Sequence, residues 1–106
     1  MESCIFCDVI AGKLPSTKLY EDDEVIVIKD IHPQAPVHWL VLSKKHVPEL
    51  LDVPDGLAGK MMVVVNTIIR AQGIKKYRIV INGKGAVLVD HLHIHVLGKI
   101  DKFRSL

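Results

Sequence analysis

The chain has 106 residues, of which 49% are apolar and 25% charged, and its formal net charge is +2 at pH 7. This length predicts a single domain, 1–106, with a modest core, and the composition excludes a largely disordered chain. A mild positive charge with 5% aromatic residues argues against nucleic acid as a partner. The longest apolar run, 61–65, is too short for a membrane span. The first residues show no secretory signal, so we expect a cytoplasmic protein.

The first third of the chain predicts a short helix followed by two paired strands. Apolar residues recur at helical spacing over 4–11, and Gly12 follows them. An acidic turn at 21–23 separates two candidate strands, 18–20 and 24–29. The second of these is apolar throughout its centre, as expected for a strand covered on both faces.

One long helix is predicted after a proline-containing loop and a third strand at 38–43. It starts with Asp55 as the N-cap, ends near Gln72 and has Gly73 as the residue beyond its end. Apolar residues follow one another at steps of three and four, which is typical of a helix with one buried face. They are Leu57, Met61, Val64, Val65, Ile68 and Ala71.

Two further strands, 77–81 and 91–97, are predicted on either side of a turn at 82–85. The order of these elements lacks the alternation of strands and helices that a parallel sheet requires. The sequence therefore predicts an α+β fold. Its sheet is a five-stranded antiparallel meander, and one long and one short helix gather on one face.

Three of the six histidines alternate in the last predicted strand, at His91, His93 and His95. Alternate residues of a strand share a face, so these side chains point together while Leu92, Ile94 and Val96 enter the core. An ordinary solvated strand face is a poorer interpretation. Other polar residues, such as Thr, Lys or Glu, would suit such a face equally well, so three alternating histidines are improbable there by chance. A single zinc ion held by all three is also disfavoured. At ~3.3 Å per residue, His91 and His95 lie about 13 Å apart along a straight strand. We predict that the histidines divide into separate tasks.

Cys4 and Cys7 have the spacing of a metal-binding pair. In a chain without an export signal, this spacing favours metal or redox chemistry over a structural disulfide. A thioredoxin-like redox pair is the weaker alternative, because the motif does not follow a strand in a βαβ unit. A zinc site would need two further ligands.

The last strand, His-Leu-His-Ile-His-Val-Leu at 91–97, resembles the signature of the histidine-triad superfamily. In that signature, alternating histidines are followed by two apolar residues. Other segments, in the same order along the chain, resemble the branch of histidine triad nucleotide-binding proteins. They are the cysteine pair at 4–7, the proline segment 30–38, Lys44-Lys45-His46, Asn82 and Leu97-Gly98. The resemblance implies a HIT-type fold whose sheet extends across a homodimer.

The resemblance implies a nucleotide-binding hydrolase or nucleotidyltransferase of the purine nucleoside phosphoramidase type. It would cleave a bond at the α-phosphorus of nucleoside 5′-phosphoramidates or related conjugates and release AMP or GMP. His93 would attack phosphorus to form a nucleotidyl-histidine, and His95 would donate to a phosphate oxygen or the leaving atom. His38 and Asn82 would complete the catalytic set, and Asp30 would accept the ribose hydroxyls. The base pocket would be walled by Ile5, Phe6, Ile28 and Ile31.

The same resemblance implies a structural zinc ion held by Cys4, Cys7, His46 and His91. Four protein ligands close the coordination shell, which is typical of structural zinc sites. This assignment agrees with the division of tasks expected from the strand geometry, since His91 would serve the metal and the other two histidines the phosphate.

The sequence departs from the family pattern immediately before the first histidine of the triad. Family members usually carry Gln-Ser where this chain has Val87 and Leu88, and Asp90 is also atypical. The tail 99–106 lacks a tryptophan that some relatives have. These departures support an alternative function, a zinc-stabilised nucleotide-binding or interaction module with little turnover.

Overall fold

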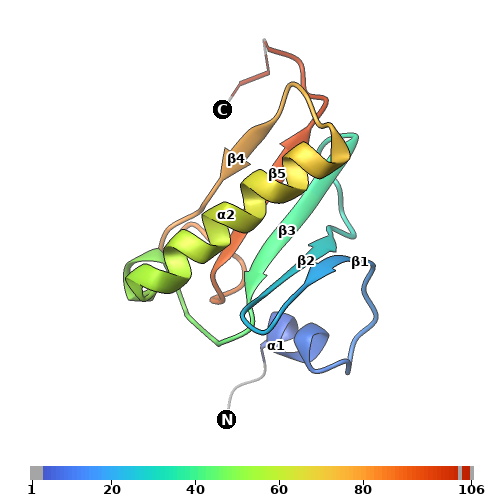
Figure 1. Cartoon of the computed structure of the whole chain (residues 1–106). Coiled ribbons are helices and arrows are strands. Elements are labelled where there is room, and N and C mark those ends of the chain that lie inside the picture. The colour runs from blue at the N-terminus through green and yellow to red at the C-terminus, as the bar shows by residue number, and fades with distance from the viewer. Residues whose placement is uncertain (1–3, 103, 106) are drawn as a thin grey trace.

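Five antiparallel strands form one sheet in the computed structural model, which describes residues 4–102, 104 and 105 (Figure 1). The predicted α+β class, with one long and one short helix, is confirmed. Among the described residues, no helix has the length and apolar character needed to cross a membrane. In chain order the elements are α1 (Ile5–Ile10), β1 (Lys18–Glu21), β2 (Val25–Lys29), β3 (Val37–Ser43), the 3₁₀ turn η1 (Leu50–Asp52), α2 (Asp55–Gln72), β4 (Arg78–Val80) and β5 (His93–Gly98).

The strands lie in the order β1-β2-β3-β5-β4 across the sheet. The first three follow one another as a meander, but β5 lies between β3 and β4, so the meander prediction is wrong for the second half of the chain. The 18-residue helix α2 is roughly 27 Å long and runs across one face of the sheet, and the segment after it leads to β4 at the sheet's other edge (Figure 1). The last strand, β5, takes an internal place between β3 and β4 and is almost wholly buried, whereas the residues of the edge strand β4 are half-buried.

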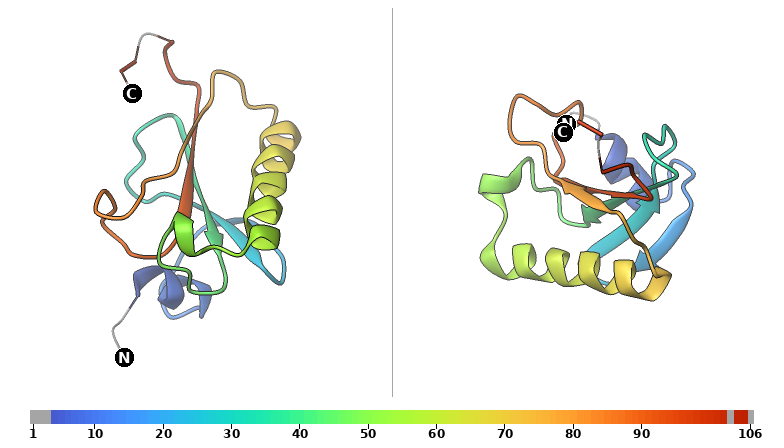
Figure 2. Two further views of the ribbon diagram at one scale, coloured as in Figure 1. Left: turned by 90° about the vertical axis from the view of Figure 1, so that its left-hand side faces the viewer. Right: turned by 90° about the horizontal axis from the view of Figure 1, so that it is seen from above.

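The two helices cover opposite faces of the sheet, so the expectation that both gather on one face is wrong (Figure 2). The apolar strand β2 explains the arrangement, because its alternate residues present apolar surface on both sides. Val25 and Val27 pack in the cluster that contains α2, while Ile26 and Ile28 pack in the cluster that contains Val9 of α1. Each face therefore needs its own cover.

The ends of α2 differ from the prediction by one residue at the start. Pro54, in an extended conformation, precedes the first turn, and Asp55 is the first helical residue instead of the cap. Its carboxylate still lies in the first turn, where the helix dipole favours a negative charge. Gly73 ends the helix with a φ of 62°, a left-handed conformation that suits glycine, as predicted. All the residues of the predicted buried face are buried except Ala71.

Candidate functional site

The face of the sheet covered by α1 carries two neighbouring histidines of β5. His93 and His95 lie opposite Leu42 and Leu40 of β3, and their ring centroids are 5.0 Å apart. Leu92, Ile94 and Val96 pack in the core on the other face, as predicted from the period of the strand. His93 is buried and His95 is half-buried, so both imidazoles lie in a setting that strengthens their electrostatic interactions.

The proton of His93 can be assigned from its hydrogen bond. Nδ1 of His93 lies 2.7 Å from the backbone carbonyl oxygen of His91. A carbonyl oxygen only accepts hydrogen bonds, so Nδ1 carries the proton and donates it. In the neutral ring, Nε2 is then left with a lone pair, which is the form a nucleophilic imidazole requires. Phe6 of α1 packs edge-on against this ring at 5.0 Å between centroids.

The proton of His95 follows from a chain of bonds that begins on the backbone. The N–H of Gln34 donates to Nδ1 of His38 at 3.0 Å, so His38 carries its proton on Nε2. That nitrogen lies 2.9 Å from Nδ1 of His95 and donates to it. His95 therefore carries its own proton on Nε2. The two neighbours on β5 present opposite functions, a lone pair on His93 and an N–H donor on His95.

Asp30 lies beside this chain, where β2 ends. Its Oδ2 is 3.3 Å from Nε2 of His38, and its Oδ1 accepts from the N–H of His32 at 2.8 Å. Burial lowers the pKa of His38; the Asp30 carboxylate opposes the shift and Arg104 adds to it. Burial, with the charges of His93 and His38, lowers the pKa of His95 to about 4. Both rings are therefore neutral at pH 7.

The low pKa of His95 predicts that the protein loses stability in mild acid. An unfolded histidine titrates near 6.5, so between pH ~6.5 and about 4 the unfolded chain binds more protons than the folded one. The free energy of unfolding should therefore fall as the pH is lowered through this range. Urea unfolding at pH 7, 6, 5 and 4 measures the slope. The slope should be shallower in His95→Gln and unchanged in His32→Gln, which alters an exposed ring. Equal slopes in all three proteins would contradict the assignment.

The residues predicted to wall a base pocket have different surroundings. Ile31 is 77% exposed and Ile5 is also exposed, both large apolar side chains without cover. Phe6 is half-buried against the histidines. Ile28 is 4% exposed and packs in the core cluster with Leu40 and Leu42, so it has little surface left for a ligand. Asn82, from the predicted catalytic set, is half-buried on the connection between β4 and β5.

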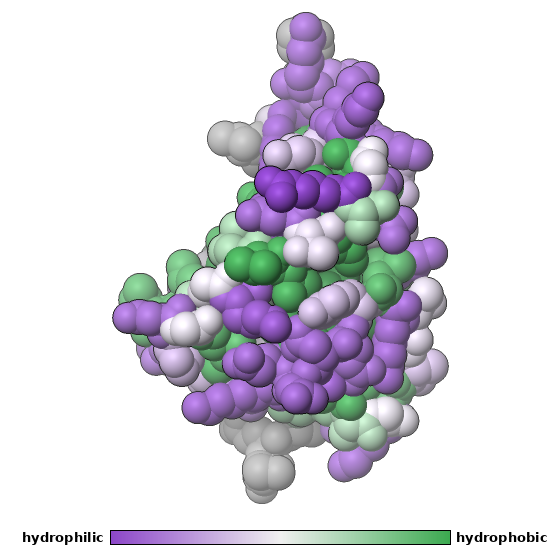
Figure 3. Space-filling model, viewed as in Figure 1, coloured by the Kyte–Doolittle hydropathy of each residue, from purple (hydrophilic) through white to green (hydrophobic). Residues whose placement is uncertain are grey.

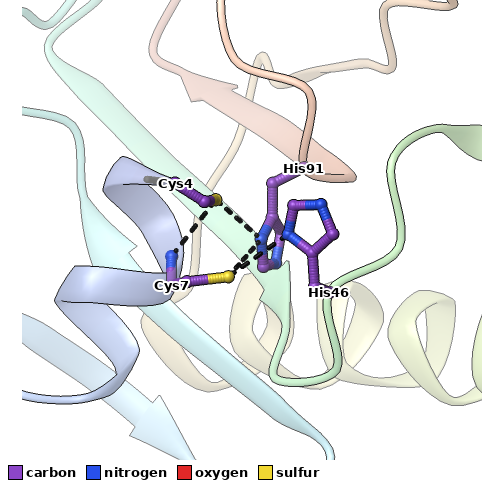
Figure 4. A group of neighbouring side chains, drawn as sticks. All are labelled: Cys4, Cys7, His46 and His91. Carbon is purple, nitrogen blue, oxygen red and sulfur yellow. Dashed lines mark hydrogen bonds between the residues drawn. The ribbon is translucent and has the colours of Figure 1, made fainter. Parts of the chain in front are cut away.

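A second cluster joins four residues from distant parts of the chain (Figure 4). Cys4 caps α1 and Cys7 lies in its first turn, while His46 follows β3 and His91 precedes β5. Nδ1 of His91 is 3.3 Å from Sγ of Cys4 and 3.5 Å from Sγ of Cys7. Nδ1 of His46 is 3.2 Å from Sγ of Cys7. The four ligand atoms all lie within 4.8 Å of one another.

These four side chains fit a tetrahedral zinc ion. Zinc bonds of ~2.3 Å to sulfur and ~2.0 Å to nitrogen put the two ligand types about 3.5 Å apart at a tetrahedral angle, close to the observed spacing. Nε2 of His91 lies 2.7 Å from the Ser43 carbonyl oxygen and donates to it, so Nδ1 keeps a lone pair toward the sulfurs. Burial, together with Cys4, raises the pKa of the Cys7 thiol to about 11. A divalent cation would offset this by stabilising the thiolates.

His91 does not belong to the strand that was predicted to begin with it. The strand starts at His93, because the two residues before it make backbone hydrogen bonds outside the sheet. The N–H of His91 donates to Val89, and the N–H of Leu92 donates to the carbonyl oxygen of Val47. The fully buried His91 ring lies with the cysteines. Sequence reasoning missed two hydrogen-bond partners, the Ser43 carbonyl of His91 and the Gln34 N–H of His38. Both are backbone groups, which every residue type except proline can supply, so the sequence gives no signal for them.

Comparisons with known proteins agree with this arrangement. The model of the HIT domain family matches residues 11–102. The protein HitA of Neisseria gonorrhoeae is 41% identical over 104 residues, which cover 92% of this chain and 97% of that protein.

Two solved structures are similar along most of the chain. A HIT family hydrolase from Legionella pneumophila Philadelphia 1 gives a TM-score of 0.86 at 34% identity, covering 93% of this chain and 95% of that one. A Zn-bound histidine triad family protein from Mycobacterium smegmatis gives a TM-score of 0.87 at 32% identity, covering 96% and 78%. These likenesses confirm the predicted HIT-type fold.

Proposed function

Because the chain belongs to the HIT domain family, we propose that it is a nucleotide-binding hydrolase or nucleotidyltransferase. It cleaves a bond at the α-phosphorus of nucleoside 5′-phosphoramidates or related nucleotidyl conjugates, through a nucleotidyl-histidine intermediate, and releases AMP or GMP. The likeness to a HIT family hydrolase supports the general class of reaction. The substrate class comes from the resemblance of the triad and of the segments before it.

The observation that carries this proposal is the opposite protonation of two adjacent rings. His93 has a lone pair on Nε2, and His95, at 5.0 Å between ring centroids, has an N–H on the same atom. A phosphoryl group between them would meet a nucleophile and a hydrogen-bond donor together. With these tautomers, the lone pair and the N–H are already in place for attack on phosphorus.

The reaction then proceeds in two displacements. In the first, the lone pair on Nε2 of His93 forms a bond to phosphorus, the phosphorus–nitrogen bond breaks, and the departing amine takes a proton from solvent. His95 donates to a phosphate oxygen as negative charge develops there. The His91 carbonyl stabilises the positive charge of the substituted His93 ring. In the second, water attacks phosphorus and loses a proton to solvent, the bond to His93 breaks, and the nucleoside monophosphate leaves.

The remaining site residues are proposed to bind the nucleotide. The Asp30 carboxylate accepts the ribose hydroxyls, and the Asn82 amide contacts the phosphate or the leaving group. The exposed side chains of Ile5 and Ile31, with Phe6, provide apolar surface for a purine base.

We also propose that the cysteine–histidine cluster holds a structural zinc ion, which would tie the N-terminal helix α1 to the sheet. The ligand geometry and the Zn-bound relative support this. The metal would hold α1 over the catalytic face, because His91 is a ligand of one site and its carbonyl orients His93 of the other.

The proposed function is tested by trapping the intermediate. After a brief exposure to adenosine 5′-phosphoramidate, intact-protein mass spectrometry should find an acid-labile adenylyl adduct, and AMP should accumulate on longer incubation. Binding of AMP without an adduct and without AMP release would reject the enzyme and support the binding module. That second candidate is favoured by Leu88, which is fully exposed where family members usually have a polar residue.

A homodimer is proposed, with the outer face of α2 and the strand β4 as contacts. Apolar patches interrupt the polar surface in the view that shows α2 in front (Figure 3), and Val63 is 60% exposed on that helix. Val63→Glu should shift the protein to a monomer in light scattering while its circular dichroism is retained. Leu51→Glu, an equivalent change at an exposed residue of η1, should leave the mass unchanged. A wild-type monomer at all concentrations would contradict the proposal.

A further inference from the structure

The side chain of Asp30 lies beside His38, which is hydrogen-bonded to His95. Its Oδ2 lies 3.3 Å from Nε2 of His38, and the exposed fractions of the two side chains are 17% and 3%. Oδ1 is engaged by the N–H of His32, which fixes the carboxylate in this orientation. A carboxylate so close to a buried N–H interacts strongly with it, because little water screens the charge.

His38 is thereby held from two sides. The Gln34 N–H occupies Nδ1 of the ring, and the Asp30 carboxylate flanks the N–H on Nε2, which itself donates to His95 at 2.9 Å. If His38 carried its proton on Nδ1 instead, that N–H would face the N–H of Gln34. The lone pair on Nε2 would then face the Asp30 carboxylate, and both contacts would be repulsive. The bond from His38 to His95 then decides which nitrogen of His95 keeps its proton.

We propose that Asp30 is a positioning residue of the catalytic pair, acting through His38 to keep the N–H of His95 available to the phosphate, apart from any contact with ribose. This inference rests on the proposed function. It gives one carboxylate two tasks, one toward the sugar and one toward the hydrogen bond between His38 and His95.

A metal ion is a poorer occupant of this place, although the ligand atoms of Asp30, His38 and His95 also lie within 4.8 Å of one another. The two nitrogens face each other at 2.9 Å in hydrogen-bond geometry. The N–H of His38 and the lone pair of His95 are therefore directed along one line, which suits a hydrogen bond, whereas the ligands of a metal must present lone pairs that converge on a point beside that line.

Charge effects on the pair agree with the geometry. Asp30 acts on both His38 and His95, Arg104 acts on His38, and His95 also feels His38 and its β5 neighbour His93. Of these, only the Asp30 carboxylate raises the pKa of either ring. Removing its charge should move the acidic limb of the pH–rate profile to lower pH.

The experiment separates the two tasks by removing the sugar hydroxyls. Wild type and Asp30→Asn are compared on adenosine 5′-phosphoramidate and on its 2′,3′-dideoxy analogue. If Asp30 positions His38, kcat on the dideoxy analogue falls roughly tenfold in Asp30→Asn, and the loss disappears in a His38→Ala background. An Asp30→Asn enzyme that matches wild type on the dideoxy analogue overturns the inference, since the carboxylate then acts on ribose alone.

A measurement independent of turnover keeps the inference testable if the proposed function fails. In wild type, ¹⁵N NMR at pH 7 should show His95 with its proton on Nε2. In Asp30→Asn, the spectrum of His95 should approach that of a mixture of two tautomers, with the proton on Nδ1 in one and on Nε2 in the other. The control His32→Ala, a change at an exposed ring, should keep the wild-type pattern. Identical His95 spectra in wild type and Asp30→Asn overturn the inference. No turnover by wild type on either substrate rejects the proposed function and leaves this result to stand.

Discussion

Replacing His93 by alanine should abolish the adenylyl adduct and lower kcat by roughly 10³-fold or more, as expected for loss of a nucleophile. The reason is that the Nε2 lone pair on this ring is set by the bond from Nδ1 to the His91 carbonyl, and alanine offers no nitrogen to phosphorus. Adduct formation by mass spectrometry and AMP release by chromatography measure the two effects separately.

Controls distinguish this loss from general damage to the fold. His95→Ala removes the proposed donor and keeps the nucleophile, so the adduct should still form, with the rate lowered by about 10²-fold or more. His32→Ala, a change at an exposed ring of the nearby loop, should leave the rate unchanged. An adduct of normal yield in His93→Ala would disprove the assigned nucleophile.

Loss of the cysteine–histidine site should have the largest effect on stability. Purified protein is expected to contain close to one zinc per chain. Cys4→Ser should lower the free energy of unfolding by roughly 3 kcal/mol or more, since metal binding and folding are coupled. For a domain of this size, such a change lowers Tm by about 10 °C or more. Metal analysis and calorimetry give the two values.

A chelator provides the matched control for this prediction. It should lower the Tm of wild type toward that of Cys4→Ser and have little further effect on the variant, because both treatments remove the same ion. A wild-type protein that contains no metal and melts at the same temperature as the variant would rule out the site.

Local sequence patterns predicted much of the fold because the features concerned depend on near neighbours. Apolar spacing in 57–68 specifies which face of α2 is buried, and that prediction is confirmed. Period-two alternation in the last strand placed Ile94 and Val96 in the core. The topology was harder. The meander prediction failed after β3, and the helices lie on opposite faces, because both features depend on packing across the whole sheet.

The candidate site shows the same limit. The resemblance named Cys4, Cys7, His46 and His91, which the structure does bring together. Nothing in the spacing of residues 91–97 showed that His91 lies outside the strand. The hydrogen bond that ends the strand there joins the N–H of Leu92 to the carbonyl oxygen of Val47, which is distant in sequence. The roles of the assembled residues remain predictions until the variants above are measured.

By itself, the sequence predicted, through the resemblance of its motifs, which side chains carry the proposed chemistry. It determined which faces of the helices and strands are apolar, because a residue's place in a repeat is a local property. The tertiary structure alone decided the protonation of the site. The lone pair of His93 and the N–H of His95 depend on hydrogen bonds to the His91 carbonyl and, through His38, to the Gln34 N–H. The bond between His38 and His95 forms only when β3 and β5 pair, and any residue type could have supplied the backbone atoms of the other two bonds.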